Sequence, residues 1–261
     1  MSYEAITFDV SNGVAEITLN DPDALNALST RMLAELRLAF EEVRNNDEIR
    51  SVLLAGAGRA FSSGANLAED EGDPNDMDVK AALEDKYNPL IRDMRDLEKP
   101  IVGAVPGIAA GAGMGVALSC DILLAAESAQ FIQIFTRIGV MPDAGCTWLL
   151  PQRVGLARAK GMALLTEPVD GKQAEQWGMI WKCLPDDQLM EEARTMAKGL
   201  AARATMALGK TKLALDLAAT NTLDVQLDLE AEWQGELGKS FDFKEGVMAF
   251  LEKRPAQFKG K

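Results

Sequence analysis

A glycine-rich segment and one isolated aspartate are the parts of this sequence whose residue types and spacing could do chemistry. Residues 101–120 carry no charged side chain, and they contain the glycine-rich run from Gly107 to Gly115. Glycines allow a tight turn and a close approach by a ligand, and a helix that begins there offers unpaired N–H groups at the positive end of its dipole. Asp143 follows further along the chain. Main-chain donors together with one carboxylate base suggest enolate chemistry.

The glycine-rich run has other interpretations. It could serve only the tight packing of a helix, or it could be a dinucleotide-binding fingerprint. The fingerprint fits poorly, because Val116 stands where its third glycine belongs and Asp121 is too close to be the ribose ligand. A Walker-type phosphate loop is excluded, because the run contains no lysine. Tight packing and a functional N–H site both stay open.

Asp143 could instead be a helix N-cap, a role that aspartate favours strongly. An apolar set surrounds it in the sequence and would desolvate the carboxylate, raising its pKa toward that of a base. This set consists of Phe131, Ile134, Phe135, Val140, Met141 and Trp148. Both interpretations of Asp143 stay open.

A second turn, residues 58–66, follows an apolar stretch at 52–55 that is typical of a strand. Two strand-end turns with free amides could clamp one carbonyl oxygen, although an ordinary strand-to-loop turn would have the same composition. Ser62 and Ser63 lie in this turn, but the chain contains no histidine that could activate a serine nucleophile.

Composition excludes several classes of function. The 261 residues include no histidine, which rules out histidine bases, Ser-His-Asp and Cys-His sites and histidine-ligated metals, so we expect no metal. With 27 basic and 40 acidic side chains the net charge is −13, which argues against nucleic acid as a partner. The three cysteines are widely spaced and form no CxxC pattern, which is typical of a reducing compartment.

The N-terminal sequence has no basic region followed by an apolar core, so we expect no signal peptide and a cytoplasmic protein. Residues 101–120 are long enough to span a bilayer at roughly 20 residues per span. Half of them, however, are glycine or alanine, and Pro106 interrupts them. We therefore expect no membrane-spanning segment and no membrane partner.

The elements that must position these residues alternate between strands and helices. Alternating stretches at residues 5–8 and 14–19, joined by Asn12-Gly13, predict a β-hairpin. Ser29 is placed to cap a helix that runs toward Asn45-Asn46. Further strands are predicted at 51–55, 101–105 and 122–126, and a helix near 81–97. This pattern is that of an α/β fold.

Strand signals nearly vanish after Gly155, and helical patterning dominates the C-terminal part. The predicted helices span residues 189–202, 204–219, 225–237 and 244–253. We therefore expect a core of residues 1–200 that holds the active site, followed by a helical region of residues 201–261. The acidic stretch 69–78 should form a solvated surface loop or a flap over the site.

At these residues the chain resembles the crotonase superfamily of enoyl-CoA hydratases and isomerases. The resemblance extends over essentially the full length, and its motifs occur in the family's order. They are residues 22–28 (PDALNAL), 58–67 with AFSSGANL, 99–102 (KPIV), 107–121, 155 onward with 174–180, and 250–254 (FLEKR) before Phe258. The resemblance implies an α/β spiral of ββα units followed by a helical C-terminal region. It also implies an acyl-CoA thioester substrate, no separate cofactor, and a homotrimer or dimer of trimers with the helical tail at the interface.

The resemblance further implies roles for individual residues. The family's oxyanion hole falls on the backbone N–H groups of Ser63 and Ala112, which would hold the thioester carbonyl. Lys253, in the C-terminal EKR motif, would meet the 3′-phosphate end of coenzyme A bound by a neighbouring subunit. The other substrate-binding positions are Ala24, Ala60, Gly64, Ala65, Asn66, Leu67, Gly111 and Phe135.

The sequence departs from the family at the residues that hydratases use. Hydratases carry two glutamates, and the aligned positions here are Gly115 and Phe135, neither of which can move a proton. The acid of the family's double-bond isomerases is retained as Asp143. Among relatives the chain is most similar to the isomerases of bacterial phenylacetate degradation, which convert a ring-epoxidised phenylacetyl-CoA to its oxepin and also shift enoyl-CoA double bonds. Asn66 and Cys146 replace a usual aspartate and a usual glycine without a functional explanation.

The resulting hypothesis is an acyl-CoA isomerase in which Asp143 removes a proton from C2 and returns it at C4. An enoyl-CoA hydratase of fatty-acid or aromatic-acid degradation is the alternative. The superfamily's aryl-CoA dehalogenases use an aspartate nucleophile assisted by histidine, which is absent here. A non-enzymatic acyl-CoA binder would show thioester affinity without turnover.

Overall fold

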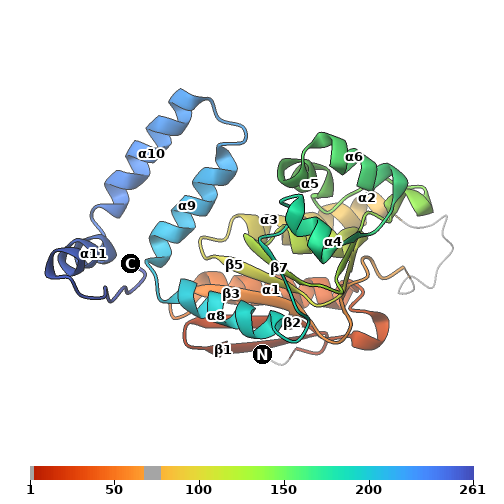
Figure 1. The fold of residues 1–261 in the computed structure, drawn as a ribbon, viewed down its shortest axis with the longest axis horizontal. Helices are drawn as coiled ribbons and strands as arrows, with labels where there is room; N and C mark the ends of the chain where they lie inside the picture. The colour runs from red at the N-terminus through yellow and green to blue at the C-terminus, as the bar shows by residue number, and fades with distance from the viewer. Residues whose placement is uncertain (1–2, 68–77) are drawn as a thin grey trace.

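The computed structural model describes residues 3–67 and 78–261, which form two β-sheets, the helices that cover them and a helical C-terminal region (Figure 1). The strands are β1 Ile6–Ser11, β2 Val14–Leu19, β3 Ser51–Gly56, β4 Ala60–Ser62, β5 Ile101–Val105, β6 Ile108–Ala110, β7 Ile122–Ala126, β8 Gln130–Ile132, β9 Val169–Asp170 and β10 Lys182–Leu184. The strands predicted at 51–55, 101–105 and 122–126 are thereby confirmed as β3, β5 and β7.

The first two strands form the predicted hairpin. They pair antiparallel from Ile6 opposite Leu19 to Ser11 opposite Val14. The connecting residues Asn12 and Gly13 have φ angles of 52° and 76°, which is the left-handed geometry of a tight two-residue hairpin turn. Asparagine and glycine adopt this conformation at low cost, so the turn chemistry fixed the register of the pair.

The strands belong to two sheets. The larger sheet has six strands in the order β1-β2-β3-β5-β7-β10, and all its neighbours except β1 and β2 are parallel. The smaller sheet has four strands in the order β4-β6-β8-β9, of which only β8 and β9 pair antiparallel. Three consecutive strand pairs, β3 with β4, β5 with β6 and β7 with β8, each send one strand to each sheet. A helical segment follows each pair, so the chain is a spiral of ββα units.

The helices begin and end at recognisable signals. The α-helices are α1 Thr30–Asn45, α2 Val79–Ala82, α3 Asn88–Arg95, α4 Gly111–Leu118, α5 Cys146–Val154, α6 Leu156–Leu165, α7 Gly171–Gln176, α8 Leu189–Ala201, α9 Thr205–Leu217, α10 Leu223–Leu237 and α11 Phe241–Glu252. Ser29 caps α1 as predicted, since its hydroxyl accepts a hydrogen bond from the Met32 N–H at 3.1 Å. The helix predicted near 81–97 is present but is interrupted by a π-helical turn, Leu83–Tyr87.

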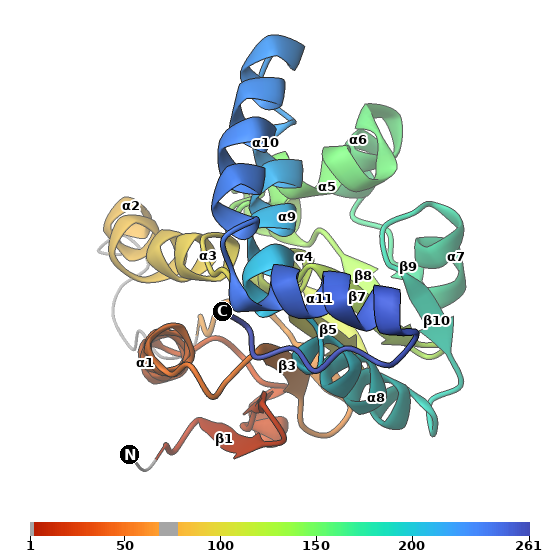
Figure 2. The same ribbon diagram turned by 90° about the vertical axis from the view of Figure 1, so that its left-hand side faces the viewer.

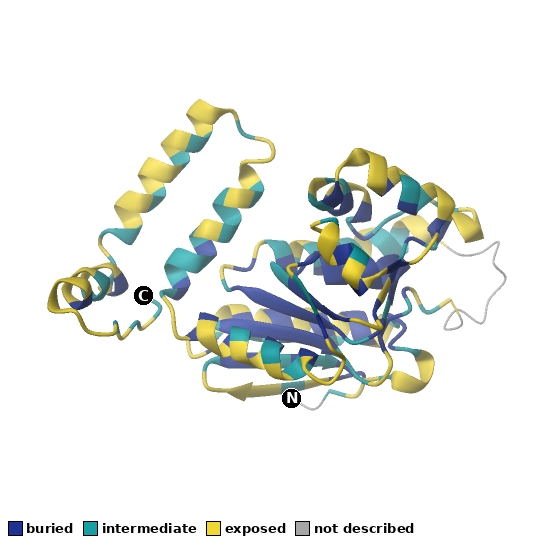
Figure 3. Ribbon diagram, in the orientation of Figure 1, coloured by how far each residue is buried: buried dark blue, intermediate teal, exposed yellow. Residues whose placement is uncertain are grey.

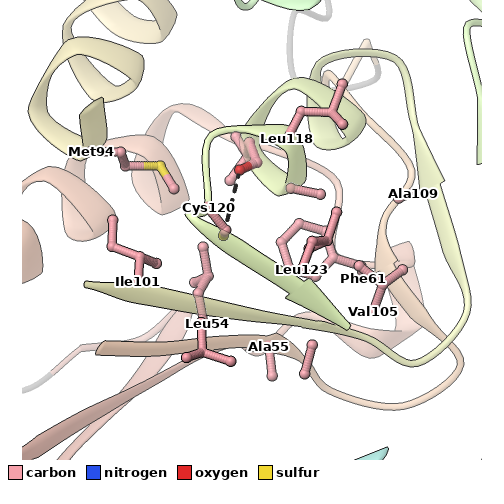
Figure 4. Packing of buried hydrophobic residues seen from close by; sticks show 14 of the residues in the cluster. Leu54, Ala55, Phe61, Met94, Ile101, Val105, Ala109, Leu118, Cys120 and Leu123 are labelled. Carbon is pink, nitrogen blue, oxygen red and sulfur yellow. Dashed lines mark hydrogen bonds between the residues drawn. The ribbon is translucent and has the colours of Figure 1, made fainter. Parts of the chain in front are cut away.

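The core lies between the sheets and the helices that cover them. Figure 3 shows the central strands and α4 buried, whereas the outer sides of the helices are exposed. Figure 4 shows part of this core, where Leu54 of β3, Ile101 of β5 and Leu123 of β7 point toward Met94 of α3 and Cys120. Every residue of α4 is buried, which explains why this helix contains no charge.

The C-terminal helices divide into two groups. The helix α8 contacts β2, β3, β5 and β7 and therefore covers one face of the larger sheet. The chain leaves the sheet between α8 and α9, and Figures 1 and 2 show α9 and α10 as a pair that stands away from it. The four helices predicted from the sequence correspond to α8–α11. The short strands β9 and β10 gave no sequence signal, because two or three residues are too few for a pattern.

Two sequence predictions concern segments near the site. Residues 101–120 form β5, β6 and α4, and no helix within the described ranges combines the length and apolar character needed to cross a membrane. The expected acidic loop or flap at 69–78 falls outside the described residues except for Asp78. The Asp78 carboxylate accepts a hydrogen bond from the Ala81 N–H at 2.9 Å and caps α2.

Candidate active site

A pocket of about 240 Å³ lies where the start of α4, the turn after β4 and the segment after β8 meet. Nine residues that the sequence singled out line it: Ser63, Gly64, Ala65, Asn66, Leu67, Gly111, Ala112, Phe135 and Asp143. They come from three successive ββα units. The spiral therefore brings together the two glycine turns and the acid, although these are far apart in the sequence.

The two turns approach each other at Gly64 and Gly111. A Cβ atom on Gly64 would lie only 2.9 Å from the Ala110 oxygen and 3.5 Å from the Ala112 nitrogen. Both glycines also have positive φ angles, +101° and +51° respectively. Glycine is needed at each position because L-residues with a side chain rarely adopt this conformation.

The start of α4 provides the first main-chain donor. Ala112 is the second residue of the helix, and within the described chain its N–H has no acceptor. Further along, Gly113 and Gly115 serve close packing: a Cβ on Gly113 would lie 2.6 Å from the Ser62 Oγ, and one on Gly115 would lie 2.4 Å from the Ala144 oxygen. The glycine-rich run thus provides tight packing, while its first turn leaves the N–H of a pocket-lining residue, Ala112, without an acceptor in the described chain.

The structure corrects the second expected donor. The Ser63 N–H donates to the carbonyl oxygen of Leu25 at 3.0 Å, so this group is already used within the protein. The flanking amides are also engaged, since the Gly64 N–H donates to the Ser62 Oγ at 3.2 Å and the Asn66 N–H donates to the Leu28 oxygen at 3.4 Å. The Ala65 N–H, in contrast, meets no acceptor in residues 3–67 or 78–261. Ala65 therefore replaces Ser63 as the candidate donor in this turn.

Asp143 is not a helix N-cap. The helix α5 begins at Cys146, its N-cap residue is Gly145, and no side chain caps it. The Asp143 carbonyl accepts a hydrogen bond from the Cys146 N–H at 2.9 Å, while its side chain lines the pocket. The buried Oδ1 atom has no hydrogen-bond partner among the described residues. The alternative of a structural cap is therefore wrong.

Burial changes the acidity of this carboxyl group. Desolvation raises the pKa of Asp143 from 3.8 to about 6. The apolar wall around it includes Ile134, Phe135, Ile138 and Val140. Three members of the apolar set expected from the sequence do not line the pocket: Phe131 is buried in the core, and Met141 and Trp148 are exposed. An acid of this strength can accept a proton near neutral pH and can return it.

The remaining sequence-predicted positions lie outside the pocket. Ala24 is exposed, although its carbonyl accepts a hydrogen bond from the Ser63 hydroxyl at 3.4 Å. Ala60 is 1% exposed, and its carbonyl accepts a hydrogen bond from the Asn26 side chain, so it supports the turn from behind. Lys253 is an exposed residue at the end of α11 and does not line the pocket of its own chain.

Sequence reasoning missed one wall of the pocket. The start of α1 and the segment from α2 through the π-helical turn contribute Leu28, Thr30, Leu33, Asp78, Val79, Ala82, Leu83, Lys86 and Tyr87. The Lys86 ammonium donates to the Thr30 hydroxyl at 2.9 Å, and the Tyr87 hydroxyl donates to the Leu28 carbonyl at 3.3 Å. π-Helical turns occur frequently at functional sites, but no sequence pattern announced this one.

No group of acidic and cysteine side chains suited to a metal ion is present in the described ranges. The site's polar groups are main-chain amides, one carboxyl and a few side chains on the wall. A family model described as Enoyl-CoA hydratase/isomerase matches residues 9–261. The chain belongs to this family.

Individual relatives extend the similarity over the whole chain. The chain is 46% identical over 260 residues to the 1,2-epoxyphenylacetyl-CoA isomerase of Escherichia coli, covering 99% of both proteins. It is 45% identical over 261 residues to the protein named "Probable enoyl-CoA hydratase" from Rhodobacter capsulatus, covering 100% of both. The structure superposes on the crystal structure of an enoyl-CoA hydratase from Bacillus anthracis with a TM-score of 0.94 at 30% identity, covering 99% of this chain and 100% of the other. The crotonase-like fold predicted from the sequence is confirmed.

As a member of the enoyl-CoA hydratase/isomerase family, this protein is unusual at the two positions where the resemblance places hydratase glutamates. Gly115 lies beneath Ala144, whose oxygen would be 2.4 Å from any Cβ, so a carboxylate does not fit there. Phe135 is 5% exposed, and its ring forms part of the pocket wall. Asp143 and Asp78 are the carboxylates among the pocket residues, and the Asp78 carboxylate is engaged as the cap of α2. Among the described pocket carboxylates, Asp143 is therefore the candidate carrier of the catalytic proton.

Proposed function

We propose that this member of the family is an acyl-CoA isomerase with a single catalytic acid. The Asp143 carboxylate removes a proton from C2 of an unsaturated acyl-CoA, and the electron pair moves into a dienolate whose negative oxygen is held by the Ala112 and Ala65 N–H groups. The protonated Asp143 then delivers the same proton to C4. The double bond has moved by one position, and no water or cofactor is consumed.

The observation that carries this proposal is the half-buried Asp143 side chain with its buried Oδ1 atom. It lies in an apolar pocket, its Oδ1 atom lacks a partner in the described chain, and its pKa is raised to about 6. A carboxyl group with a pKa near the working pH is suited both to take up and to release a proton. The similarity to an epoxyphenylacetyl-CoA isomerase at 46% identity supports an isomerase, and an epoxide or oxepin is a candidate substrate on the same ground.

The alternative is an enoyl-CoA hydratase, which the relative at 45% identity favours. Hydration adds water across the double bond and ordinarily needs a second group to orient and activate that water. Gly115 and Phe135 cannot provide such a group. Comparing hydration of crotonyl-CoA with isomerisation of 3-hexenoyl-CoA on one preparation distinguishes the two functions, and dominant hydration would assign the protein to the alternative.

Asp143→Asn provides the direct test. The amide cannot accept the C2 proton, so kcat for isomerisation of 3-hexenoyl-CoA should fall by about 100-fold or more. Binding of a saturated acyl-CoA should persist, because the pocket walls are unchanged. Asp187→Asn is the matched control, since Asp187 is an exposed carboxylate outside the pocket. Isomerisation by Asp143→Asn within a few-fold of the unmodified protein contradicts the proposal.

We further propose that the protein acts in the cytoplasm as a homotrimer or a dimer of trimers. The apolar residues left exposed on α9–α11 support an interface there, and they include Leu215, Leu223, Phe243, Phe250 and Leu251. In such an assembly Lys253 would serve the coenzyme A bound by a neighbouring subunit. The oligomeric state follows from sedimentation velocity on the full chain.

A further inference from the structure

The peptide group between Gly111 and Ala112 has two polar ends. Its N–H belongs to Ala112 and its carbonyl oxygen to Gly111, and both residues line the pocket at the start of α4. A trans peptide is planar, and its N–H and C=O point in opposite directions. A contact at the Gly111 oxygen therefore acts on the same rigid group whose other end would hold the thioester oxygen.

That contact is made by Cys146, the first residue of α5. The Cys146 Sγ lies 3.8 Å from the Gly111 oxygen, and the side chain is 1% exposed. Burial, with a smaller contribution from the neighbouring Asp143 carboxylate, raises the pKa of the Cys146 thiol to about 12, although the Gln133 side chain opposes the shift. The group thus remains a neutral thiol at physiological pH, and its S–H is a hydrogen-bond donor.

The Gly111 oxygen lies in the first turn of α4, where the helix supplies its own N–H donor, and the Cys146 thiol adds a second donor from outside this helix. Gly111 has a φ angle of +51°, and glycine can occupy both the left-handed and the right-handed regions at little cost. Rotation of the Gly111–Ala112 peptide would turn the Ala112 N–H away from the pocket. A donor placed behind the Gly111 oxygen opposes that rotation, and it also polarises the peptide and strengthens its N–H as a donor.

We propose that Cys146 is a positioning residue that holds and polarises the Gly111–Ala112 peptide, so that the Ala112 N–H stabilises the substrate's enolate oxygen more strongly. The inference rests on the proposed function, because it assigns the Ala112 N–H to the thioester carbonyl. It also gives a role to the cysteine that stands where the family resemblance places a glycine.

The expected size of the effect is modest. Removing an oxyanion donor outright lowers kcat by roughly 100- to 1000-fold. Polarisation by a second hydrogen bond changes donor strength by about 10–30%. If the thiol contributes this fraction of the donor's free energy, its removal takes the same fraction of the logarithm of the donor's rate effect. The predicted loss in kcat is then about two- to eight-fold. KM should change little, because the effect is larger on the enolate than on the neutral thioester.

The chain contains a matched control. Cys120 is also fully buried, and its Sγ lies 3.9 Å from the carbonyl oxygen of Val116, which belongs to the same helix α4 (Figure 4). The Val116 peptide is not part of the pocket wall. Cys120→Ala therefore removes the same kind of contact without touching the proposed donor.

The experiment measures the carbonyl stretch of bound butyryl-CoA, labelled with ¹³C at the thioester carbon, by infrared difference spectroscopy. In the unmodified protein and in Cys120→Ala, binding should lower the carbonyl frequency by the same amount. In Cys146→Ala the lowering should be smaller, and kcat for 3-hexenoyl-CoA should fall two- to eight-fold. Equal lowering and equal kcat in Cys146→Ala and Cys120→Ala overturn the role of Cys146 while leaving the proposed function in place.

Two further outcomes keep the test decisive. If binding lowers the carbonyl frequency in none of the proteins, including the unmodified one, the proposed oxyanion hole fails and the inference fails with it. If Cys146→Ala does not fold, the S–H stretch of Cys146 is followed in Cys120→Ala/Cys183→Ala, where it is the one remaining thiol. Butyryl-CoA should shift this band to lower frequency, and an unchanged band overturns the inference.

Discussion

Asp143 combines an unpaired buried oxygen with an apolar surround, and both features come from its place in the fold. The residue precedes α5 without capping it, so its side chain is free to line the pocket. Desolvation is the cause of its raised pKa, and no cation is among the contributors to that shift. A carboxyl oxygen that is buried without a hydrogen-bond partner lowers the stability of the fold. Its retention is consistent with a function, since strained or desolvated groups are concentrated at active sites.

The pH dependence of turnover should reveal this carboxyl group. The proposed isomerisation uses the Asp143 carboxylate as its base, so kcat/KM should rise about tenfold per pH unit below pH 6 and level off above it. The measurement is kcat/KM for 3-hexenoyl-CoA between pH 4.5 and pH 8, with far-UV circular dichroism recorded at each pH to show that the protein stays folded. A rate that is constant from pH 5 to pH 7 would show that a group with a pKa near 6 does not limit the reaction.

The raised pKa of Asp143 also predicts that the stability of the folded protein falls with increasing pH, whereas its activity rises. The folded-state pKa of about 6 lies above the ordinary value of 3.8, so the folded protein favours the neutral acid and loses stability as pH rises from about 4 to about 6. Asp143→Asn removes this cost. At pH 7.5 the variant should be more stable by on the order of 1 kcal/mol, less than the full shift implies because the side chain is partly exposed. Urea unfolding at pH 7.5 and pH 4 measures the difference, which should shrink at the lower pH.

At the scale of elements, the helix α4 lies at the centre of the site and contacts several of the other segments that form it. Its first turn carries the candidate donor, and its glycines let β4 and the loop before α5 approach closely. Its other end is held by Arg153 of α5, whose guanidinium donates to the carbonyl oxygens of Leu118 at 2.8 Å and Cys120 at 2.7 Å. Arg153 lies in the last turn of α5, and Asp143 lies in the turn that precedes this helix. The contact of Arg153 with α4 therefore also connects Asp143 to the helix that carries the candidate donor.

Gly115 should be intolerant of any side chain. In Gly115→Ala the new Cβ would lie 2.4 Å from the Ala144 oxygen, so the loop that carries Asp143 must shift. We expect a loss of about 1–3 kcal/mol in the free energy of unfolding and a lower kcat. Gly161→Ala in α6 is the matched control, because no atom lies within 4 Å of its added Cβ. That variant should gain about 0.4–1 kcal/mol and keep its activity.

The comparison depends on both glycines being within helices and on their φ angles lying outside the left-handed region. If Gly115→Ala and Gly161→Ala have equal free energies of unfolding in urea, the loop before α5 can shift away from the new Cβ atom without destabilising the fold. That result would contradict the prediction. For the same reason, Gly115→Glu should not introduce hydration of crotonyl-CoA. A gain of hydratase activity in Gly115→Glu would contradict the packing argument.

At the scale of the whole molecule, the chain separates a buried catalytic core from a C-terminal part with much exposed apolar surface. Leu223 of α10 is 72% exposed and Phe250 of α11 is 83% exposed, values that are high for large apolar residues. The net charge of −13 makes the surface unfavourable for an anionic ligand such as coenzyme A. A local cation is therefore needed where the nucleotide binds, and Lys253 is proposed to provide it from a neighbouring subunit.

Lys253→Gln tests that proposal. Loss of one charged hydrogen bond to the 3′-phosphate should raise KM for an acyl-CoA by about tenfold or more. The corresponding N-acetylcysteamine thioester lacks the nucleotide, so its KM should not change. Lys239→Gln, at another exposed position near the end of α10, is the control. An unchanged KM for the acyl-CoA in Lys253→Gln would remove this residue from the binding site.

Local sequence features predicted the elements well. The Asn12-Gly13 turn set the hairpin, Ser29 capped α1, and the apolar run at 101–105 formed β5 with the predicted bounds. These features act through neighbours in the sequence, so their effect could be anticipated. The prediction of an α/β spiral came from motif order. The π-helical turn, the smaller sheet of β4, β6, β8 and β9, and the strand β10 were missed, because these elements are short and depend on partners elsewhere in the chain.

The sequence by itself excluded histidine-based chemistry, and it indicated main-chain amides and the isolated Asp143 as the candidate groups. Only the tertiary structure decided which amides are available. The Ser63 N–H donates a hydrogen bond to the carbonyl of Leu25, a residue from an earlier part of the chain, whereas the Ala65 N–H has no acceptor among the described residues. Residue types are local facts, whereas hydrogen-bond partners and desolvation arise when distant segments meet. For that reason the candidate base could be named before the fold was known, whereas the pair of free main-chain amides could not.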